Sequence, residues 1–241
     1  MDRVIYLSMA GAKATMQRQD VLANNLANAS TSGFRAELQA FRAVPVRGDG
    51  ASTRVYALES TVGHDLRSGP IQTTGRGLDV APVGGAWLAV QSLDGTEAYT
   101  RAGSLQVGAD GTLVTHAGLP VLGDGGPVQL PANAAIEVAS DGTITAQVGN
   151  ERPQPVGRLK LVTPEAPLAR GADGLFRAAE GELPADPAAR VQGGALEGSN
   201  VSPVETMVAM IAAARQFEHQ MKMLQGAEQR EQAASKLLGP Q

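Results

Sequence analysis

Both ends of this chain carry apolar residues at gaps of three and four, and this pattern limits the fold more than any other feature. The C-terminal stripe runs from Val204 to Leu224 without an intervening proline or glycine. Residues spaced in this way share one face of an α-helix, so the spacing predicts a long amphipathic helix. Gly226 weakens that helix by about 1 kcal/mol relative to alanine, without necessarily ending it before Leu238.

The start of the C-terminal helix has a clear local signal. Ser202 suits the capping position, Pro203 suits the first helical position, and Glu205 is placed to close a capping box. A second stripe, from Ile5 to Leu26, predicts an N-terminal helix over about 2–28.

Neither terminal helix is expected to be stable by itself. Burying one of the larger apolar side chains contributes about 1.5 to 3 kcal/mol, whereas ordering each residue costs roughly 1.5 kcal/mol of conformational entropy. The large apolar side chains in both stripes are few. Two such helices at opposite ends of a chain favour an assembling coiled coil over a closed globule.

Between the helices the sequence changes character twice. Turn-forming Asn and Ser residues over 24–35 predict the end of the first helix, and Gly33 permits a positive φ there. Over 36–76 no clear period remains, so we expect an extended connecting segment with one or two short strands, such as 54–58.

From about Leu78 to Val191 short β-branched runs alternate with Asp-Gly pairs, which predicts antiparallel β-structure joined by two-residue primed turns. Calcium binding is a weaker interpretation, because each turn carries one carboxylate and an EF-hand needs several at fixed spacing. The candidate strands are 87–91, 98–101, 105–107, 112–115, 120–122, 135–138, 143–147 and 156–162, with a further run at 173–177, and the Asp-Gly pairs begin at Asp94, Asp110, Asp124 and Asp141.

Composition excludes several classes of function. The 241 residues suffice for one large domain or two modest ones, and aromatic residues make up only 3%, so the core is expected to consist of small and branched aliphatic side chains. A net charge of −4 with interspersed signs gives no basic surface for nucleic acid. The absence of cysteine excludes disulfides and thiolate chemistry.

The chain also lacks an apolar stretch of membrane-spanning length and the apolar core of a secretory signal, which by itself suggests a cytosolic protein. No nucleophile motif or metal-ligand spacing is present, and we expect no cofactor, no metal and no enzymatic activity. Arg76, Asp79, Tyr99 and Arg101 form the best polar group, for which a structural role is favoured over a site.

Several segments resemble the flagellar basal-body rod and hook proteins, in the order found in that family. The opening 1–6, the run 157–162 and Gly198 are most similar to the proximal rod members. The family motifs lie at Asn24-Asn25-Leu26-Ala27-Asn28 with Gly33-Phe34-Arg35, at Leu78-Asp79-Val80-Ala81, Trp87-Leu88-Ala89-Val90 and Ala98-Tyr99-Thr100-Arg101-Ala102-Gly103, and at Leu196-Glu197-Gly198-Ser199-Asn200-Val201.

The resemblance implies a mainly β fold with α-helical termini. The terminal segments 1–35 and 200–241 would pair as a coiled-coil tube domain, 36–76 would connect, and 77–199 would form an antiparallel β-domain outside the tube. It implies a structural subunit that stacks helically with copies of itself and other rod proteins into a hollow drive shaft that transmits torque. It also implies export through the flagellar type III apparatus without a cleaved signal, which moves the expected location to the periplasmic part of the basal body.

Two alternatives remain at this stage: a distal rod or hook-type axial protein of the same family, and a non-flagellar β-rich periplasmic binding module. The interpretation as a rod subunit predicts an assembly interface on both helices and both terminal motifs. Its residues are Ile5, Met9, Met16, Leu22, Asn24, Asn25, Leu26, Asn28, Gly33, Phe34, Leu196, Ser199, Asn200, Val201, Val204, Met207, Ile211, Phe217, Met221 and Leu224.

Overall fold

The computed structural model describes residues 2–45 and 55–238. The chain is mainly β-structure with one α-helix near each end, as expected. It divides into two compact units: unit 1 comprises 1–29, 36–66 and 201–241, and unit 2 comprises 30–35 and 67–200. Within the described ranges no helix combines the length and apolarity needed to cross a membrane.

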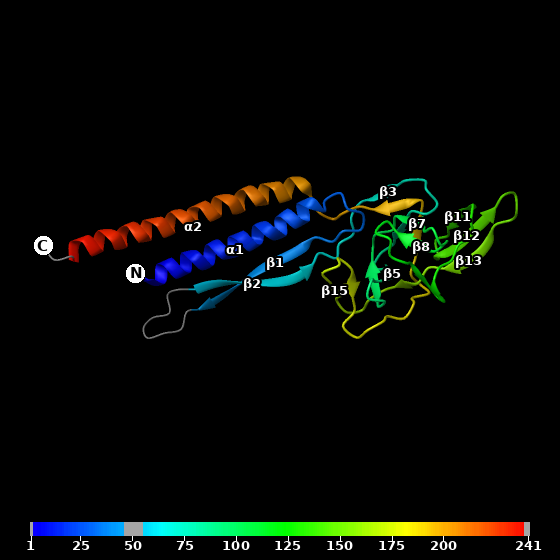
Figure 1. Cartoon of the computed structure of the whole chain (residues 1–241), viewed down its shortest axis with the longest axis horizontal. Helices are drawn as coiled ribbons and strands as arrows, with labels where there is room; N and C mark the ends of the chain where they lie inside the picture. Colours follow the sequence, from blue (N-terminus) through cyan, green and yellow to red (C-terminus); the bar gives the residue numbers. More distant parts are fainter. Residues whose placement is uncertain (1, 46–54, 239–241) are drawn as a thin grey trace. The chain divides into compact units, whose positions relative to one another are not determined.

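Unit 1 contains two long helices that lie side by side and antiparallel, α1 (Asp2–Ala27) and α2 (Pro203–Leu238) (Figure 1). The predicted start of α2 is confirmed, since the helix begins at Pro203 and Thr206 N–H donates to the Ser202 carbonyl at 3.0 Å. The continuation to Leu238 is confirmed as well, because Gly226 does not interrupt the helix.

A β-hairpin packs beside α1 in the same unit, formed by β1 (Glu37–Pro45) and β2 (Val55–His64) (Figure 1). We expected only short strands here, and the first residue of the expected strand 54–58 lies outside the described residues. A two-stranded ribbon is marginal without further packing, and α1 supplies that packing, so the local sequence is a weak guide to it.

Unit 2 consists of short antiparallel strands. Their bounds are β3 (Ile71–Thr73), β4 (Val80–Pro82), β5 (Trp87–Gln91), β6 (Glu97–Thr100), β7 (Leu105–Val107), β8 (Leu113–Thr115), β9 (Leu122–Gly123), β10 (Gly126–Pro127), β11 (Ala134–Val138), β12 (Thr143–Val148), β13 (Gln154–Arg158), β14 (Leu161–Val162), β15 (Ala169–Arg170), β16 (Phe176–Arg177), β17 (Val191–Gly193) and β18 (Ala195–Glu197).

The largest sheet of unit 2 has the strand order β14-β5-β6-β16-β15, and a three-stranded sheet has the order β11-β12-β13. The last two strands return to the beginning of the unit, where β17 pairs with β4 and β18 pairs with β3. The end of unit 2 is therefore hydrogen-bonded to its start, which brings the C-terminal family motif next to the residues that follow the hairpin.

Four turns of unit 2 share one geometry that differs from the predicted type. Each has a glycine with φ between +80° and +85° directly after an aspartate, and its N–H donates to the carbonyl three residues before it. A type I′ turn needs positive φ at both central residues, and among the described residues only Asn133 is a non-glycine with positive φ. The turns are three-residue loops that end in a left-handed glycine. Three of them are predicted pairs, Asp94-Gly95, Asp110-Gly111 and Asp141-Gly142, and the fourth contains Asp173-Gly174. The remaining predicted pair, Asp124-Gly125, joins β9 and β10 with no positive φ at either residue, so it is not a primed turn either.

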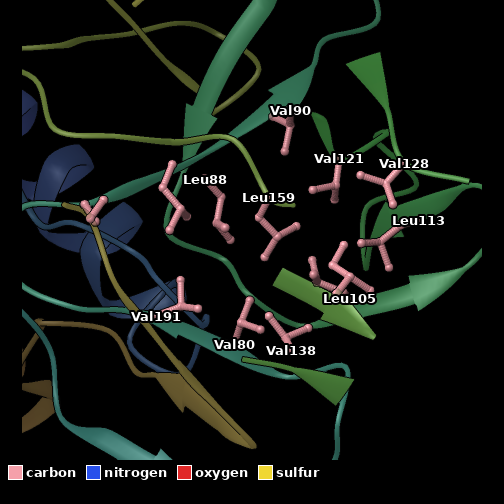
Figure 2. Packing of buried hydrophobic residues seen from close by; sticks show 14 of the residues in the cluster. Val80, Leu88, Val90, Leu105, Leu113, Val121, Val128, Val138, Leu159 and Val191 are labelled. Carbon is pink, nitrogen blue, oxygen red and sulfur yellow. The ribbon is translucent and has the colours of Figure 1, made fainter. Parts of the chain in front are cut away.

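Aliphatic side chains fill the main core of unit 2, as the low aromatic content predicts (Figure 2). Leu88, Leu105, Leu113 and Ile144 in this core are inaccessible to solvent. The aromatic residues of the unit gather instead in a second cluster, where the ring centroids of Trp87 and Phe176 lie 4.7 Å apart.

Candidate functional site

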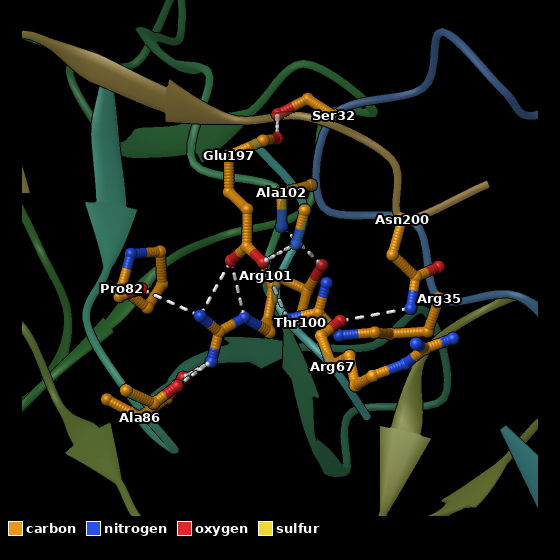
Figure 3. Close-up of polar contacts among 12 residues, drawn as sticks. Ser32, Arg35, Arg67, Pro82, Ala86, Thr100, Arg101, Ala102, Glu197 and Asn200 are labelled. Carbon is orange, nitrogen blue, oxygen red and sulfur yellow. Dashed lines mark hydrogen bonds and ion pairs between the residues drawn. The ribbon is translucent and has the colours of Figure 1, made fainter. Parts of the chain in front are cut away.

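A buried carboxylate in the C-terminal family motif organises the polar interior of unit 2. Glu197, at the end of β18, is 1% exposed, and its Oε1 accepts a hydrogen bond from Arg35 Nη2 at 2.7 Å. Its Oε2 accepts from Arg101 Nε at 2.6 Å (Figure 3). Two buried guanidinium groups therefore share one buried carboxylate, and removal of that charge would leave both cations uncompensated.

Arg101 is fixed on its other side by the backbone of the β4–β5 loop. Its terminal nitrogens donate to the carbonyls of Pro82, Gly84 and Ala86 at 2.7, 2.9 and 2.6 Å. Burial lowers the pKa of Arg101, and the charge of Glu197 opposes that shift. All hydrogen bonds from this side chain thus go to the protein's own atoms, which is the pattern of a structural group.

The same glutamate holds two further chain segments. Ser32 Oγ and Gly33 N–H donate to the Glu197 backbone carbonyl at 3.0 and 2.8 Å, and Gly69 N–H donates to Oε1 at 2.8 Å. We call this set the Glu197 network. It consists of Glu197 with Ser32, Gly33, Arg35, Gly69 and Arg101.

Asn200 adds a second tie close to the Glu197 network. Its side-chain amide donates to the Arg67 carbonyl at 3.0 Å, and its backbone N–H donates to the Phe34 carbonyl at 3.4 Å. The chain enters or leaves unit 2 at Ser30, Arg35, Arg67 and Asn200. The Glu197 network and Asn200 therefore fasten together, within unit 2, the stretches of chain that carry these four ends.

Gly33 is required by geometry in this arrangement. Its φ is +70°, a conformation that residues with a side chain rarely adopt, and an added Cβ would lie 2.3 Å from the backbone carbon of Arg101. The neighbouring Phe34 ring is buried beneath the guanidinium of Arg170, 4.8 Å from the ring centroid. Both residues of the N-terminal family motif thus serve internal packing of unit 2.

The asparagines of the N-terminal motif have separate roles in unit 1. Asn25 is buried, and its side chain donates to the Glu37 carbonyl at 3.0 Å and accepts from the Glu37 N–H at 2.9 Å, which fixes the start of β1. The Asn28 side chain donates to the Asn24 carbonyl at 3.0 Å and so caps the end of α1, as predicted.

The buried side chains of α1 and α2 are small. Ala14 and Thr15 are buried on α1, and Ala213 is buried on α2. A Cβ added to Gly11 would lie 3.0 Å from the side chain of Gln220, so the two helices approach closely at that point. Small contact residues permit such a short separation between helix axes.

Several larger apolar side chains lie on the exposed sides of the helices. Val204, Met207, Val208 and Ile211 are between 51% and 72% exposed, and we call them the α2 patch. Thr206 and Ala213 mark the buried side of α2, so the α2 patch occupies the outward side of its first turns. On α1, among the side chains that are described, the exposed large apolar residues are Tyr6, Met9 and Met16, which we call the α1 patch.

The predicted interface residues therefore occur in three settings. Those that are exposed are Met9, Met16, Asn24, Val204, Met207, Ile211 and Met221. Those that are partly buried are Ile5, Leu22, Leu26, Asn28, Leu196, Asn200, Phe217 and Leu224. Those that are buried are Asn25, Gly33, Phe34, Ser199 and Val201.

Sequence reasoning left Arg35 and Glu197 out of the candidate residues. The available signal was a single acidic residue between Leu196 and Gly198, in a segment without other charges. The predicted polar group is divided in the structure: Arg76 pairs with Asp79 at 3.4 Å, whereas Arg101 belongs to the Glu197 network.

Tyr99, the remaining member of that group, has its own partners. Its hydroxyl donates to Glu97 at 2.8 Å and accepts from the Leu183 N–H at 2.6 Å. Burial raises its pKa to about 12. These contacts hold strands and loops of unit 2 together, in agreement with the structural role favoured from the sequence.

The Glu197 network bonds to the protein's own atoms, and both helices carry exposed apolar patches, which are features of a structural subunit of a larger assembly. Three family models match the sequence: "Flagella basal body rod protein" over residues 5–35, "Flagellar hook protein FlgE/F/G D1 domain" over 83–146, and "Flagellar basal body rod FlgEFG protein C-terminal" over 192–237. The chain belongs to the FlgF family of flagellar basal-body rod proteins, as its full-length relatives show.

Those relatives include the flagellar basal-body rod proteins FlgF of Salmonella typhimurium and of Escherichia coli, which are 49% and 48% identical to the chain. Each alignment covers 99% of both sequences. A rod protein named FlgG, from Agrobacterium fabrum, is 30% identical over 98% of this chain and 99% of its own length. The resemblance inferred from the motifs is confirmed, and membership in a family of structural rod components also confirms that the chain is not an enzyme.

Proposed function

We propose that this chain is a subunit of the proximal part of the flagellar rod, and that α1 and α2 pack against the helices of neighbouring subunits in a helical array. The identities to FlgF-named relatives, which exceed those to FlgG-named relatives, favour the proximal over the distal rod. In this array the segments 1–35 and 200–241 form the hollow inner tube, and the β-domain over 77–199 lies outside it.

The observation that carries this proposal is the exposure of large apolar side chains on both helices. Thr206 and Ala213 mark the buried side of α2, so the α2 patch lies on the opposite side of that helix, and the α1 patch is exposed as well. Each of these larger side chains contributes roughly 1.5 to 3 kcal/mol when it is fully buried. Clustered apolar surface of this kind marks a contact with another chain.

The α2 patch ends where the outward side of the helix becomes charged. Beyond Ile211 the exposed side chains include Arg215, Glu218 and Lys222. The two patches have different residues and lie on different helices, so a contact between unlike surfaces is available. Such a head-to-tail contact does not close on itself and propagates as a helical array, as a hollow shaft that transmits torque requires.

We further propose that the subunit reaches the periplasmic part of the basal body through the flagellar type III export apparatus, without a cleaved signal. The marginal stability expected of the terminal helices supports this route. Helices of marginal stability remain unfolded during export, and contacts with neighbouring subunits at the site of assembly help to offset the entropy of ordering them.

The test replaces one residue of the α2 patch and a matched polar residue of the same helix. Ile211→Asp places a carboxylate in the proposed contact, whereas Gln216→Asp places the same group at an exposed position outside the α2 patch. Each variant is expressed in a strain of its own bacterium that lacks the parent gene, and basal bodies are purified and probed for the subunit.

We expect Ile211→Asp to fold normally by circular dichroism, to be lost from basal bodies and to abolish motility. Gln216→Asp is expected to behave as the parent. Loss of one buried isoleucine alone weakens a contact by roughly tenfold to a hundredfold. Incorporation of Ile211→Asp at the parental level would show that the α2 patch is not an assembly contact.

A further inference from the structure

The sulfur atoms of this chain are concentrated on the exposed surfaces of the two helices. The sequence has seven methionines and no cysteine. Among the residues that the structure describes, five methionines are exposed and all five lie on α1 or α2, whereas Met210 is only partly exposed. The exposed set is Met9, Met16, Met207, Met221 and Met223.

Exposure decides how these side chains react. A thioether in contact with solvent is open to two-electron oxidants such as hydrogen peroxide, and oxidation turns a flexible apolar side chain into a polar sulfoxide. In this reaction a sulfur lone pair forms a bond to one peroxide oxygen, the O–O bond breaks, and the second oxygen leaves as water. The sulfur is oxidised, the peroxide is reduced, and no further reactant is needed.

We propose that the exposed methionines of α1 and α2 are an oxidation site that controls whether the subunit can assemble. The free subunit is oxidised at these positions by peroxide, and the sulfoxides block packing of the helices against a neighbour. The modification follows from exposure alone, but its effect on assembly rests on the proposed function.

The positions of the methionines connect this chemistry to assembly. Met207 belongs to the α2 patch, and Met9 and Met16 belong to the α1 patch. Methionine is flexible and polarisable, so it adapts to neighbours of different shape, which a subunit that meets both its own copies and other rod proteins requires. A sulfoxide buried there without a hydrogen-bond partner weakens the contact by about tenfold or more.

A rate measurement on the purified full chain tests the site itself. The chain is treated with hydrogen peroxide, and sulfoxide formation at each methionine is followed by peptide mass spectrometry. We expect the five exposed methionines to react faster than Met210. If Met210 reacts as fast as Met9, Met16 and Met207, exposure does not select the site and the proposal fails.

A second measurement compares the free chain with purified basal bodies. We expect Met9, Met16 and Met207 to be oxidised at least about tenfold more slowly in basal bodies, because neighbouring subunits cover them. Equal oxidation in the two samples would overturn the inference although the chain is present in the rod. Absence of the chain from basal bodies would instead refute the proposed function.

A competition experiment tests the effect on assembly. A variant with all five exposed methionines replaced by leucine keeps apolar side chains of similar volume and similar helix propensity. The parent and the variant, carrying different tags, are expressed together, and cells are exposed to peroxide during rod assembly. We expect the ratio of variant to parent in basal bodies to rise about tenfold with peroxide and to stay near one without it. An unchanged ratio would overturn the proposal.

Discussion

Replacing Glu197 with glutamine keeps the size of the side chain and removes the only negative charge between Arg35 and Arg101. Both arginines are at most 3% exposed, so water cannot compensate them. Breaking a buried ion pair in this way typically destabilises a protein by about 3 to 5 kcal/mol. We therefore expect Glu197→Gln to destabilise unit 2 by that amount.

Urea unfolding followed by fluorescence measures this change directly. Trp87 is the sole tryptophan of the chain, and it is buried against Phe176 in unit 2, so its emission reports on that unit. With a slope of about 2 kcal/mol per molar urea, the expected loss lowers the midpoint by roughly 2 M. Glu151→Gln makes the same chemical change at an exposed position and is expected to leave the midpoint unchanged.

Arg35→Met separates charge balance from packing. Among the described residues, Arg35 Nε and Nη1 have no hydrogen-bond partner, and the side chain contributes the second cation to a single carboxylate. Its removal leaves Glu197 and Arg101 as a neutral pair, so the destabilisation should be about 1 to 2 kcal/mol. If Arg35→Met destabilises unit 2 as much as Glu197→Gln, charge compensation is not what Glu197 supplies.

Three further predictions concern Gly33 and Asn200, stability in acid, and the terminal helices. Gly33→Val and Asn200→Leu should each impair rod assembly and motility, because the first creates a clash with the Arg101 backbone and the second removes a tie to Arg67; normal motility of both would contradict this. The hydrogen bond from Arg177 lowers the pKa of Asp173 to about 2, so its ionised form stabilises the fold above about pH 4, and this contribution is lost as the pH falls towards 2. The urea midpoint of the parent should accordingly exceed that of Asp173→Asn at pH 5 and converge with it near pH 2. In a dilute monomer α1 and α2 should exchange amide protons faster than unit 2, and strong protection of both helices would refute their dependence on neighbours.

Local sequence signals predicted the kinds of elements well. Ser202 and Pro203 marked the start of α2 because capping is decided by adjacent residues. The Asp-Gly pairs marked turns correctly, but their type was wrong. The distinction depends on the φ of the aspartate, which the pair alone does not determine. The β1–β2 hairpin was underestimated because its stability depends on packing against α1.

By itself the sequence determined the order of elements, the aliphatic core and the family, since these follow from periodicity, composition and motifs. Only the tertiary structure decided which side of each helix faces inward. The helices bury small residues such as Ala14 and Ala213 and leave Met9 and Ile211 exposed. Apolar spacing alone does not tell a core from a surface reserved for another chain. The role of Glu197 was likewise decided by the tertiary structure, because Arg35 and Arg101 are distant in sequence and meet only when β18 pairs with β3.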